Sequence, residues 1–149
     1  MPPDIPFKHE FVEYVPAEPE AGTLYVSIPF ATAVHKCACG CGQEVVTPLS
    51  PTDWQLTFDG QKVSLNPSIG NWSFPCQSHY WITRDRVRWA RHMSRREIDA
   101  GRQRDRWLKE RYFDSAGEVA EATVPGETSQ TQGESHQSFW RRIWRYFSR

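Results

Sequence analysis

Soft metal ligands are concentrated in two short segments of the 149-residue chain. Cys37, Cys39 and Cys41 lie together in the first segment, and Cys76 and His79 form the second. Zinc binds four thiolate or imidazole ligands in a tetrahedron, and small domains commonly supply them as two clusters separated by a loop. The sequence therefore predicts a single zinc site that is assembled from two distant pieces of chain.

Five candidate ligands compete for the four positions of such a site. Cys76 and His79 have the two-residue spacing of a zinc-binding cluster. The preferred set is Cys37, Cys41, Cys76 and His79, with Cys39 as the substitute for one of the first two. Spacing alone leaves open which of the three N-terminal cysteines is not a ligand.

Disulfide bonds are a second use for four cysteines. The first ten residues contain three prolines and several charged side chains, and they lack the apolar segment of a secretion signal. We therefore expect a cytoplasmic protein, in which thiols stay reduced. His35 lies two residues before the first cluster, and we expect it to pack beside the metal site without binding the metal.

Cys76 and His79 could also act as a nucleophile and its base. No orienting carboxylate or oxyanion motif is recognisable near them, so the sequence gives no candidate catalytic residue. A metal-dependent enzyme would need an open position with water as the fourth zinc ligand. We therefore expect a non-enzymatic protein and keep a metal-dependent hydrolase as an alternative.

The segments that position the ligands predict a mainly β fold. Residues 8–15, 23–30 and 44–47 are rich in β-branched and aromatic side chains, which favours strands. Alternating apolar residues on both sides of Asp59-Gly60 predict one β-hairpin, and residues 80–90 predict a second. Residues 66–72 contain Pro, Ser, Gly and Asn, which predicts a turn-rich bridge rather than a ligand loop.

The domain organisation follows from these changes in composition. We expect an N-terminal arm over residues 1–7 and a zinc-binding β domain over 8–93, built of hairpins in a zinc-ribbon-like arrangement. A basic helix over 94–114, a disordered linker over 115–138 and a short amphipathic helical tail over 139–149 complete the chain. The expected fold class is thus a small zinc-stabilised β domain with one appended α-helix.

Charge is distributed unevenly, although the net formal charge is zero. Residues 1–80 carry three basic and eight acidic side chains, whereas residues 84–114 carry eleven and six. Ser94 and Glu97 fit a capping box at the start of the basic helix. Its arginines could bind nucleic acid, but the interleaved acids favour a solvated helix with internal ion pairs.

The last eleven residues combine aromatic and arginine side chains. Phe139, Trp140, Ile143, Trp144 and Phe147 would share one face of a helix. Such a short helix is marginal alone in water, so it is expected to bind an anionic membrane surface, a partner groove or the core of its own chain.

The order of motifs resembles a bacterial family, the domain of unknown function 6527. The resemblance covers about residues 24–89 and is carried by the strings HKCACGCG, NPSIGNWSFPC and SHYWI. It implies a small metal-binding domain that uses Cys37, Cys39, Cys41, Cys76 and His79. Family members are often encoded near components of ubiquitin-like conjugation, and the resemblance implies no catalytic residue.

These observations together favour a zinc-binding adaptor protein. The resemblance implies a role in a bacterial ubiquitin-like conjugation pathway, in antiviral defence, with a ubiquitin-like protein or its activating or conjugating enzyme as the partner. Seven tryptophans in a short chain would supply exposed contact surface for that partner.

Overall fold

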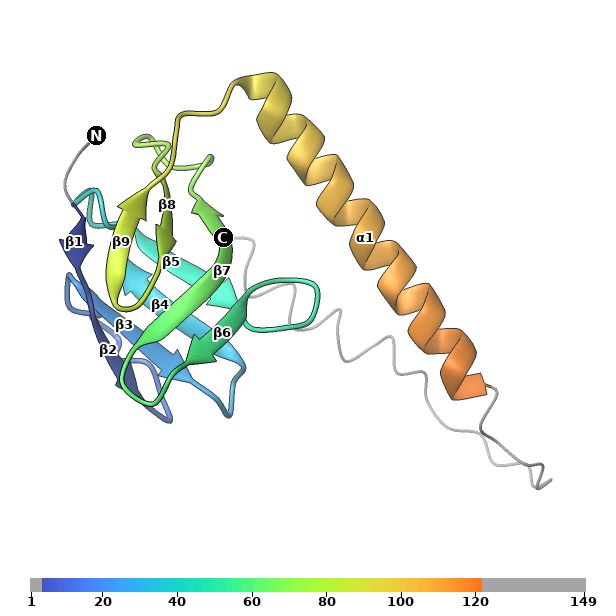
Figure 1. Ribbon diagram of the computed structural model, residues 1–149, viewed down its shortest axis with the longest axis horizontal. Coiled ribbons are helices and arrows are strands. Elements are labelled where there is room, and N and C mark those ends of the chain that lie inside the picture. Colours follow the sequence, from blue (N-terminus) through green and yellow to red (C-terminus); the bar gives the residue numbers. More distant parts are fainter. Residues whose placement is uncertain (1–3, 122–149) are drawn as a thin grey trace. The chain divides into compact units, whose positions relative to one another are not determined.

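The computed structural model describes residues 4–121, which form nine strands in two sheets and one helix (Figure 1). The predicted mainly β fold with an appended helix is confirmed. The described residues up to Ser115 belong to one compact unit. The predicted tail, residues 139–149, and most of the predicted linker lie outside the described residues.

The first sheet has five strands, and all of its neighbours are antiparallel. Both predicted hairpins are confirmed here; the first joins β6 (Gln55–Phe58) to β7 (Val63–Gly70), and the second joins β8 (His79–Ile82) to β9 (Arg86–Trp89). At the first turn, the Asp59 carboxylate accepts hydrogen bonds from the backbone N–H groups of Gln61 and Lys62. The spatial order is β1 (Ile5–Pro6), β9 (Arg86–Trp89), β8 (His79–Ile82), β7 (Val63–Gly70) and β6 (Gln55–Phe58).

The second sheet has four strands in the order β2 (Lys8–Phe11), β3 (Thr23–Ser27), β4 (Thr32–Lys36) and β5 (Glu44–Pro48). The β2–β3 pair is parallel, and the other two pairs are antiparallel. Strand β4 was not expected from the sequence. Its three central residues are all buried, so the alternation of polar and apolar residues that marks a half-exposed strand is absent.

The N-terminal segment is also more ordered than expected. Ile5 and Pro6 pair with Val87 and Arg86 at the edge of the first sheet, and the Phe7 side chain is buried. Burial of the Phe7 side chain stabilises this short segment enough to offset the conformational entropy that is lost when it becomes ordered.

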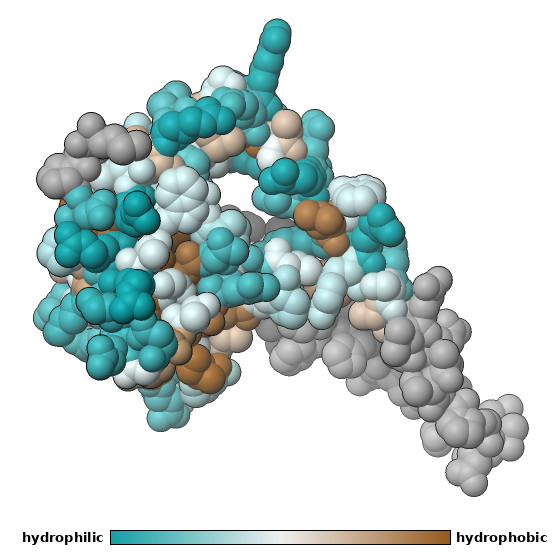
Figure 2. Space-filling view, in the orientation of Figure 1, coloured by the Kyte–Doolittle hydropathy of each residue, from teal (hydrophilic) through white to brown (hydrophobic). Residues whose placement is uncertain are grey.

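Both sheets contribute to one hydrophobic core. Leu24 and Val26 from β3 pack in the same cluster as Leu65, Tyr80 and Ile82 from the first sheet. The two sheets therefore face each other, as Figure 1 shows. The face drawn in Figure 2 is mostly hydrophilic, with small separate hydrophobic patches.

Strand β7 contains a pronounced bulge. Leu65 pairs with Ile82 and Ile69 pairs with Tyr80, so three residues of β7, at positions 66–68, lie opposite the single residue Trp81. The prediction of a turn-rich bridge over 66–72 was therefore wrong for the residues up to Gly70. Pro67 cannot donate a backbone hydrogen bond, and a bulge tolerates that loss within a strand.

Helix α1 (Arg95–Glu121) begins as the sequence predicts and ends later. The Ser94 N–H donates to Glu97 Oε2 at 2.8 Å, and the Glu97 N–H donates to Ser94 Oγ at 3.4 Å, which confirms the capping box. Among the helical residues that the structure describes, no segment combines the length and apolarity that crossing a bilayer requires.

We predict that the Leu24→Ala substitution destabilises the fold by about 2–5 kcal/mol, because it leaves a cavity between the two sheets. Ile28, just beyond the same strand, is 61% exposed, and Ile28→Ala is expected to cost no more than about 0.5 kcal/mol. Urea unfolding of both variants measures the difference. Equal losses of stability would contradict the shared core described above.

Candidate functional site

Four cysteine side chains converge where the two sheets meet. The Sγ atoms of Cys37, Cys39, Cys41 and Cys76 all lie within 4.8 Å of one another, with separations of 3.4 Å for Cys37–Cys39, 3.9 Å for Cys37–Cys76 and 3.7 Å for Cys41–Cys76. A tetrahedral thiolate site with metal–sulfur bonds of about 2.3 Å has sulfur–sulfur edges of about 3.8 Å. All four cysteines are free of disulfide bonds, and their arrangement fits one metal ion.

Tight local turns bring the first three cysteines together. Cys37 follows strand β4, and its N–H donates to the Gln43 carbonyl across the loop. Gly40 and Gly42 have φ angles of 84° and 77°, a left-handed conformation that glycine adopts without steric cost. The loop therefore folds back on itself and presents three sulfur atoms on a few residues.

Polar side chains support the cysteine cluster from within the protein. Ser78 Oγ lies 3.1 Å from Cys37 Sγ, and the Asn71 amide donates to Ser78 Oγ at 2.9 Å and to Cys37 Sγ at 3.6 Å. Although burial acts in the opposite direction, hydrogen bonds from the Ser78 hydroxyl and N–H lower the pKa of the Cys76 thiol to about 6. This favours the thiolate, which is the form that binds metal.

His79 lies outside the cysteine cluster, which corrects the preferred ligand set. Its Nε2 atom is 2.9 Å from Ser68 Oγ, and its Nδ1 atom is 3.0 Å from the Arg91 carbonyl oxygen. Cys39 occupies the fourth position of the cluster instead. Side chains alternate along a strand, so Ser78 faces the sulfur atoms while His79, the next residue, faces the other side.

His35 lies outside the cysteine cluster and packs against Tyr80. It is fully buried, and its Nε2 atom lies 2.8 Å from the Tyr80 hydroxyl. Burial lowers the pKa of His35 to about 4, so the ring is neutral near pH 7.

The hydrogen bonds of His79 determine which ring nitrogen carries the proton. A carbonyl oxygen only accepts hydrogen bonds, so in the neutral ring Nδ1 carries the proton and donates to Arg91. Nε2 is then left with its lone pair and accepts the hydrogen bond from the Ser68 hydroxyl. This is the arrangement in which a histidine activates a serine as a nucleophile.

The bulge in β7 and two tryptophans position this serine–histidine pair. Ser68 lies within the bulge, and Gly70 of the same strand pairs with His79. The His79 ring packs against those of Trp72 and Trp81, with centroid distances of 4.9 and 5.8 Å. A Cβ atom at Gly70 would lie 2.4 Å from Trp72 Nε1, so the missing side chain at this position lets Trp72 pack beside His79.

Sequence reasoning found the four cysteines and missed Ser68. The two-residue spacing indicated His79 as a base only for Cys76. The sequence does contain Ser68 in the PSIG string and His79 in the SHYWI string, but nothing in these strings indicates that the two residues are in contact. Only the register of β7 against β8 shows that these two side chains meet.

Comparison with known proteins gave one informative result. No curated protein and no solved structure matched the chain. The model of the family "Bacterial ubiquitination-like system serine protease (BubE)" matches residues 11–90, which is more than half of the chain and contains all four cysteines, Ser68 and His79. The match supports the predicted link with ubiquitin-like conjugation, whereas identity with the numbered family stays a prediction. The chain belongs to the BubE family of bacterial ubiquitination-like systems.

Proposed function

We propose that this protein is a serine protease that cleaves an amide bond in a ubiquitin-like protein or in its conjugates. One observation carries the proposal: Nε2 of His79 accepts from Ser68 Oγ at 2.9 Å while Nδ1 donates to the Arg91 carbonyl at 3.0 Å. The description of the matching family supports both the serine chemistry and the class of substrate.

The reaction would proceed in two halves. Ser68 Oγ attacks the substrate carbonyl carbon, and its proton passes to His79 Nε2. When the C–N bond breaks, His79 gives that proton to the leaving amine, and an acyl ester remains on Ser68. Water then attacks the ester with His79 again acting as the base, and cleavage of the bond from carbon to Ser68 Oγ releases the carboxylic acid and restores the serine hydroxyl.

The cysteine cluster would serve this reaction as a structural zinc site. Four thiolates complete the tetrahedron that zinc prefers, so no position is left for a catalytic water. Bound zinc would cross-link the loop after β4 to the turn before β8. Because Ser78 contacts the sulfur atoms and His79 is the next residue, this cross-link also holds the start of the strand that carries the base.

Two other expectations from the sequence bear on this proposal. Thiolate ligands persist where thiols stay reduced, which supports a cytoplasmic location. Nucleic-acid binding is less well supported, because several basic side chains already pair with acids; these are Arg84 with Asp59, Arg91 with Glu97 and Lys109 with Asp53.

A protein partner could also be recognised at an exposed aromatic cluster. Phe11 and Phe58 are each almost half exposed, and their rings make an edge-to-face contact at 5.3 Å. Such surface favours contact with another protein. A purely non-enzymatic adaptor would use this surface and have no need of the Ser68 hydroxyl.

The Ser68→Ala variant is expected to lose at least about 10³-fold in kcat, because the nucleophile is removed. The substrate is the ubiquitin-like protein of the same system with a C-terminal extension, and mass spectrometry follows the cleavage. A fluorophosphonate probe should label Ser68 of the wild-type protein. Ser73→Ala is the matched control, since Ser73 is exposed and five residues away. Equal cleavage by the wild type and the Ser68→Ala variant would rule out the proposed nucleophile and favour the adaptor role.

Elemental analysis of the purified protein is expected to find one zinc ion per chain. Cys76→Ala should lose that zinc and unfold at neutral pH, since structural zinc contributes about 10–16 kcal/mol of apparent binding free energy in small peptides. His79→Ala should retain zinc, because His79 lies outside the cluster. A soluble, folded Cys76→Ala protein with unchanged zinc content would contradict the proposed site.

A further inference from the structure

The group that orients His79 belongs to an irregular segment of backbone. Arg91 lies between the end of β9 at Trp89 and the start of α1 at Arg95, outside any strand or helix. The Ala90 N–H donates to the His79 carbonyl at 2.9 Å, which ends the pairing of this segment with β8. The direction of the Arg91 carbonyl therefore depends on other contacts.

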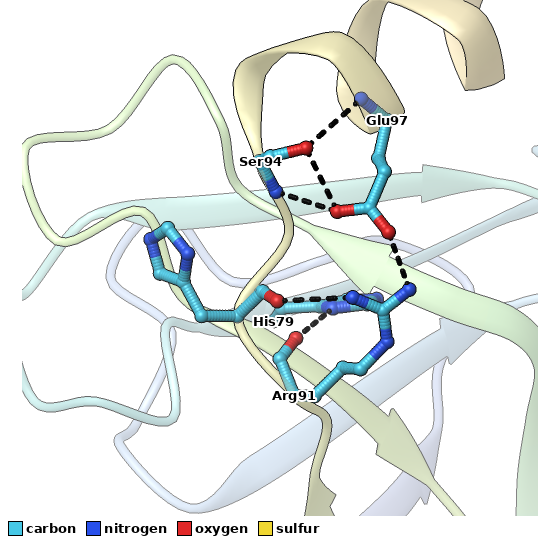
Figure 3. A network of polar contacts seen from close by, with 5 residues as sticks. His79, Arg91, Ser94 and Glu97 are labelled. Atoms are coloured by element: carbon cyan, nitrogen blue, oxygen red, sulfur yellow. Dashed lines mark hydrogen bonds and ion pairs between the residues drawn. The ribbon is translucent and has the colours of Figure 1, made fainter.

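The Arg91 side chain makes two of these contacts, because its guanidinium donates to the His92 carbonyl at 3.3 Å and also to the side chain of Glu97. The Arg91 guanidinium donates to Glu97 Oε1 at 2.6 Å, and the same carboxylate accepts through Oε2 from the Ser94 N–H at 2.8 Å and from the Ser94 hydroxyl at 2.9 Å (Figure 3). One carboxylate thus closes the capping box and holds Arg91 at the same time. The hydrogen bond from Arg91 lowers the pKa of Glu97 to about 2, so this carboxylate stays ionised near neutral pH.

The network forms a continuous path from the helix to the nucleophile. It runs from the first turn of α1 through Glu97 to Arg91, from the Arg91 carbonyl to His79 Nδ1, and from His79 Nε2 to Ser68. In Ser-His-Asp triads a carboxylate contacts the histidine directly and fixes its tautomer. In this protein the Arg91 backbone carbonyl contacts His79 directly, and the Glu97 carboxylate contacts Arg91 instead of the histidine.

We propose that Glu97 is a positioning residue for the Ser68–His79 pair, acting through Arg91. The proposal rests on the proposed protease function, and the experiment below separates the two. The family match ends at residue 90, so Arg91 and Glu97 lie immediately beyond the matched region. The positioning therefore comes from the segment that follows the matched region, namely Arg91 and the first turn of α1.

The test compares three substitutions in the full-length protein. Glu97→Gln keeps the shape of the side chain and removes the charge that pairs with Arg91. Arg91→Gln breaks the same ion pair and leaves the capping box of Ser94 and Glu97 intact, so it separates positioning from helix capping. Asp99→Asn is the matched control, because it removes one exposed carboxylate from the same turn region of α1.

The first readout is independent of catalysis. Long-range ¹H–¹⁵N NMR of the wild-type protein should show the His79 ring as the neutral tautomer with the proton on Nδ1. Both Glu97→Gln and Arg91→Gln should give a mixture of tautomers and faster exchange of the Nδ1 proton, while Asp99→Asn should match the wild type. A wild-type spectrum for both pair variants would overturn the proposal.

The second readout is the cleavage of the extended ubiquitin-like protein. Each pair variant should lower kcat roughly three- to tenfold with KM changed less than twofold, and the double variant should be no slower than either single one, because both changes break one interaction. Additive losses in the double variant would overturn the coupling between the two residues. A wild-type protein that shows the expected tautomer, and its shift in the variants, but cleaves nothing would refute the protease function and support the positioning.

Discussion

The convergence of four sulfur atoms from two sheets is the constraint on which the arrangement of this protein depends. Cys37, Cys39 and Cys41 follow a strand of the four-stranded sheet, whereas Cys76 precedes a strand of the five-stranded sheet. The apolar core between the sheets is non-directional and sets their separation more than their register. Four sulfur ligands around one ion would be directional, and such a site would fix which residues lie opposite each other.

The strand that leaves the cysteine cluster divides its side chains between two environments. Ser78 and Tyr80 face inward, toward the sulfur atoms and the buried His35, while His79 and Trp81 face outward. The opposite strand supplies Ser68 from a bulge, which turns a side chain of an otherwise regular strand toward His79. The cysteine cluster and the serine–histidine contact are thus both contacted from one strand and its first flanking residue, without sharing a side chain.

Features that depend on residues close together in the sequence were predicted better than features that depend on residues far apart in the sequence. Hairpins and the capping box depend on neighbouring residues, and both were predicted correctly. Strand β4 was missed because burial on both faces removes the alternation that reveals a strand. The four cysteines were found because thiols in a chain with reduced cysteines have few other uses.

The errors at the candidate site have a common physical cause. The spacing of Cys76 and His79 fits a zinc cluster, but spacing does not show which face of a strand a residue occupies. Ser68 and His79 meet only because three residues of β7 are accommodated opposite one residue of β8. Contacts that depend on strand register and on a bulge are not encoded in any short motif, and they required the three-dimensional structure.

The short distance along the chain between Cys76 and His79 limits how this region can evolve. Loss or gain of one residue between them would exchange the faces of the following side chains, turning the imidazole inward and Ser78 outward. A single change in length of this kind would separate His79 from Ser68 and would also separate the Ser78 hydroxyl from the cysteine sulfurs. Lineages of this domain should therefore tolerate amino-acid replacement at Gln77 more readily than any change in the length of this segment.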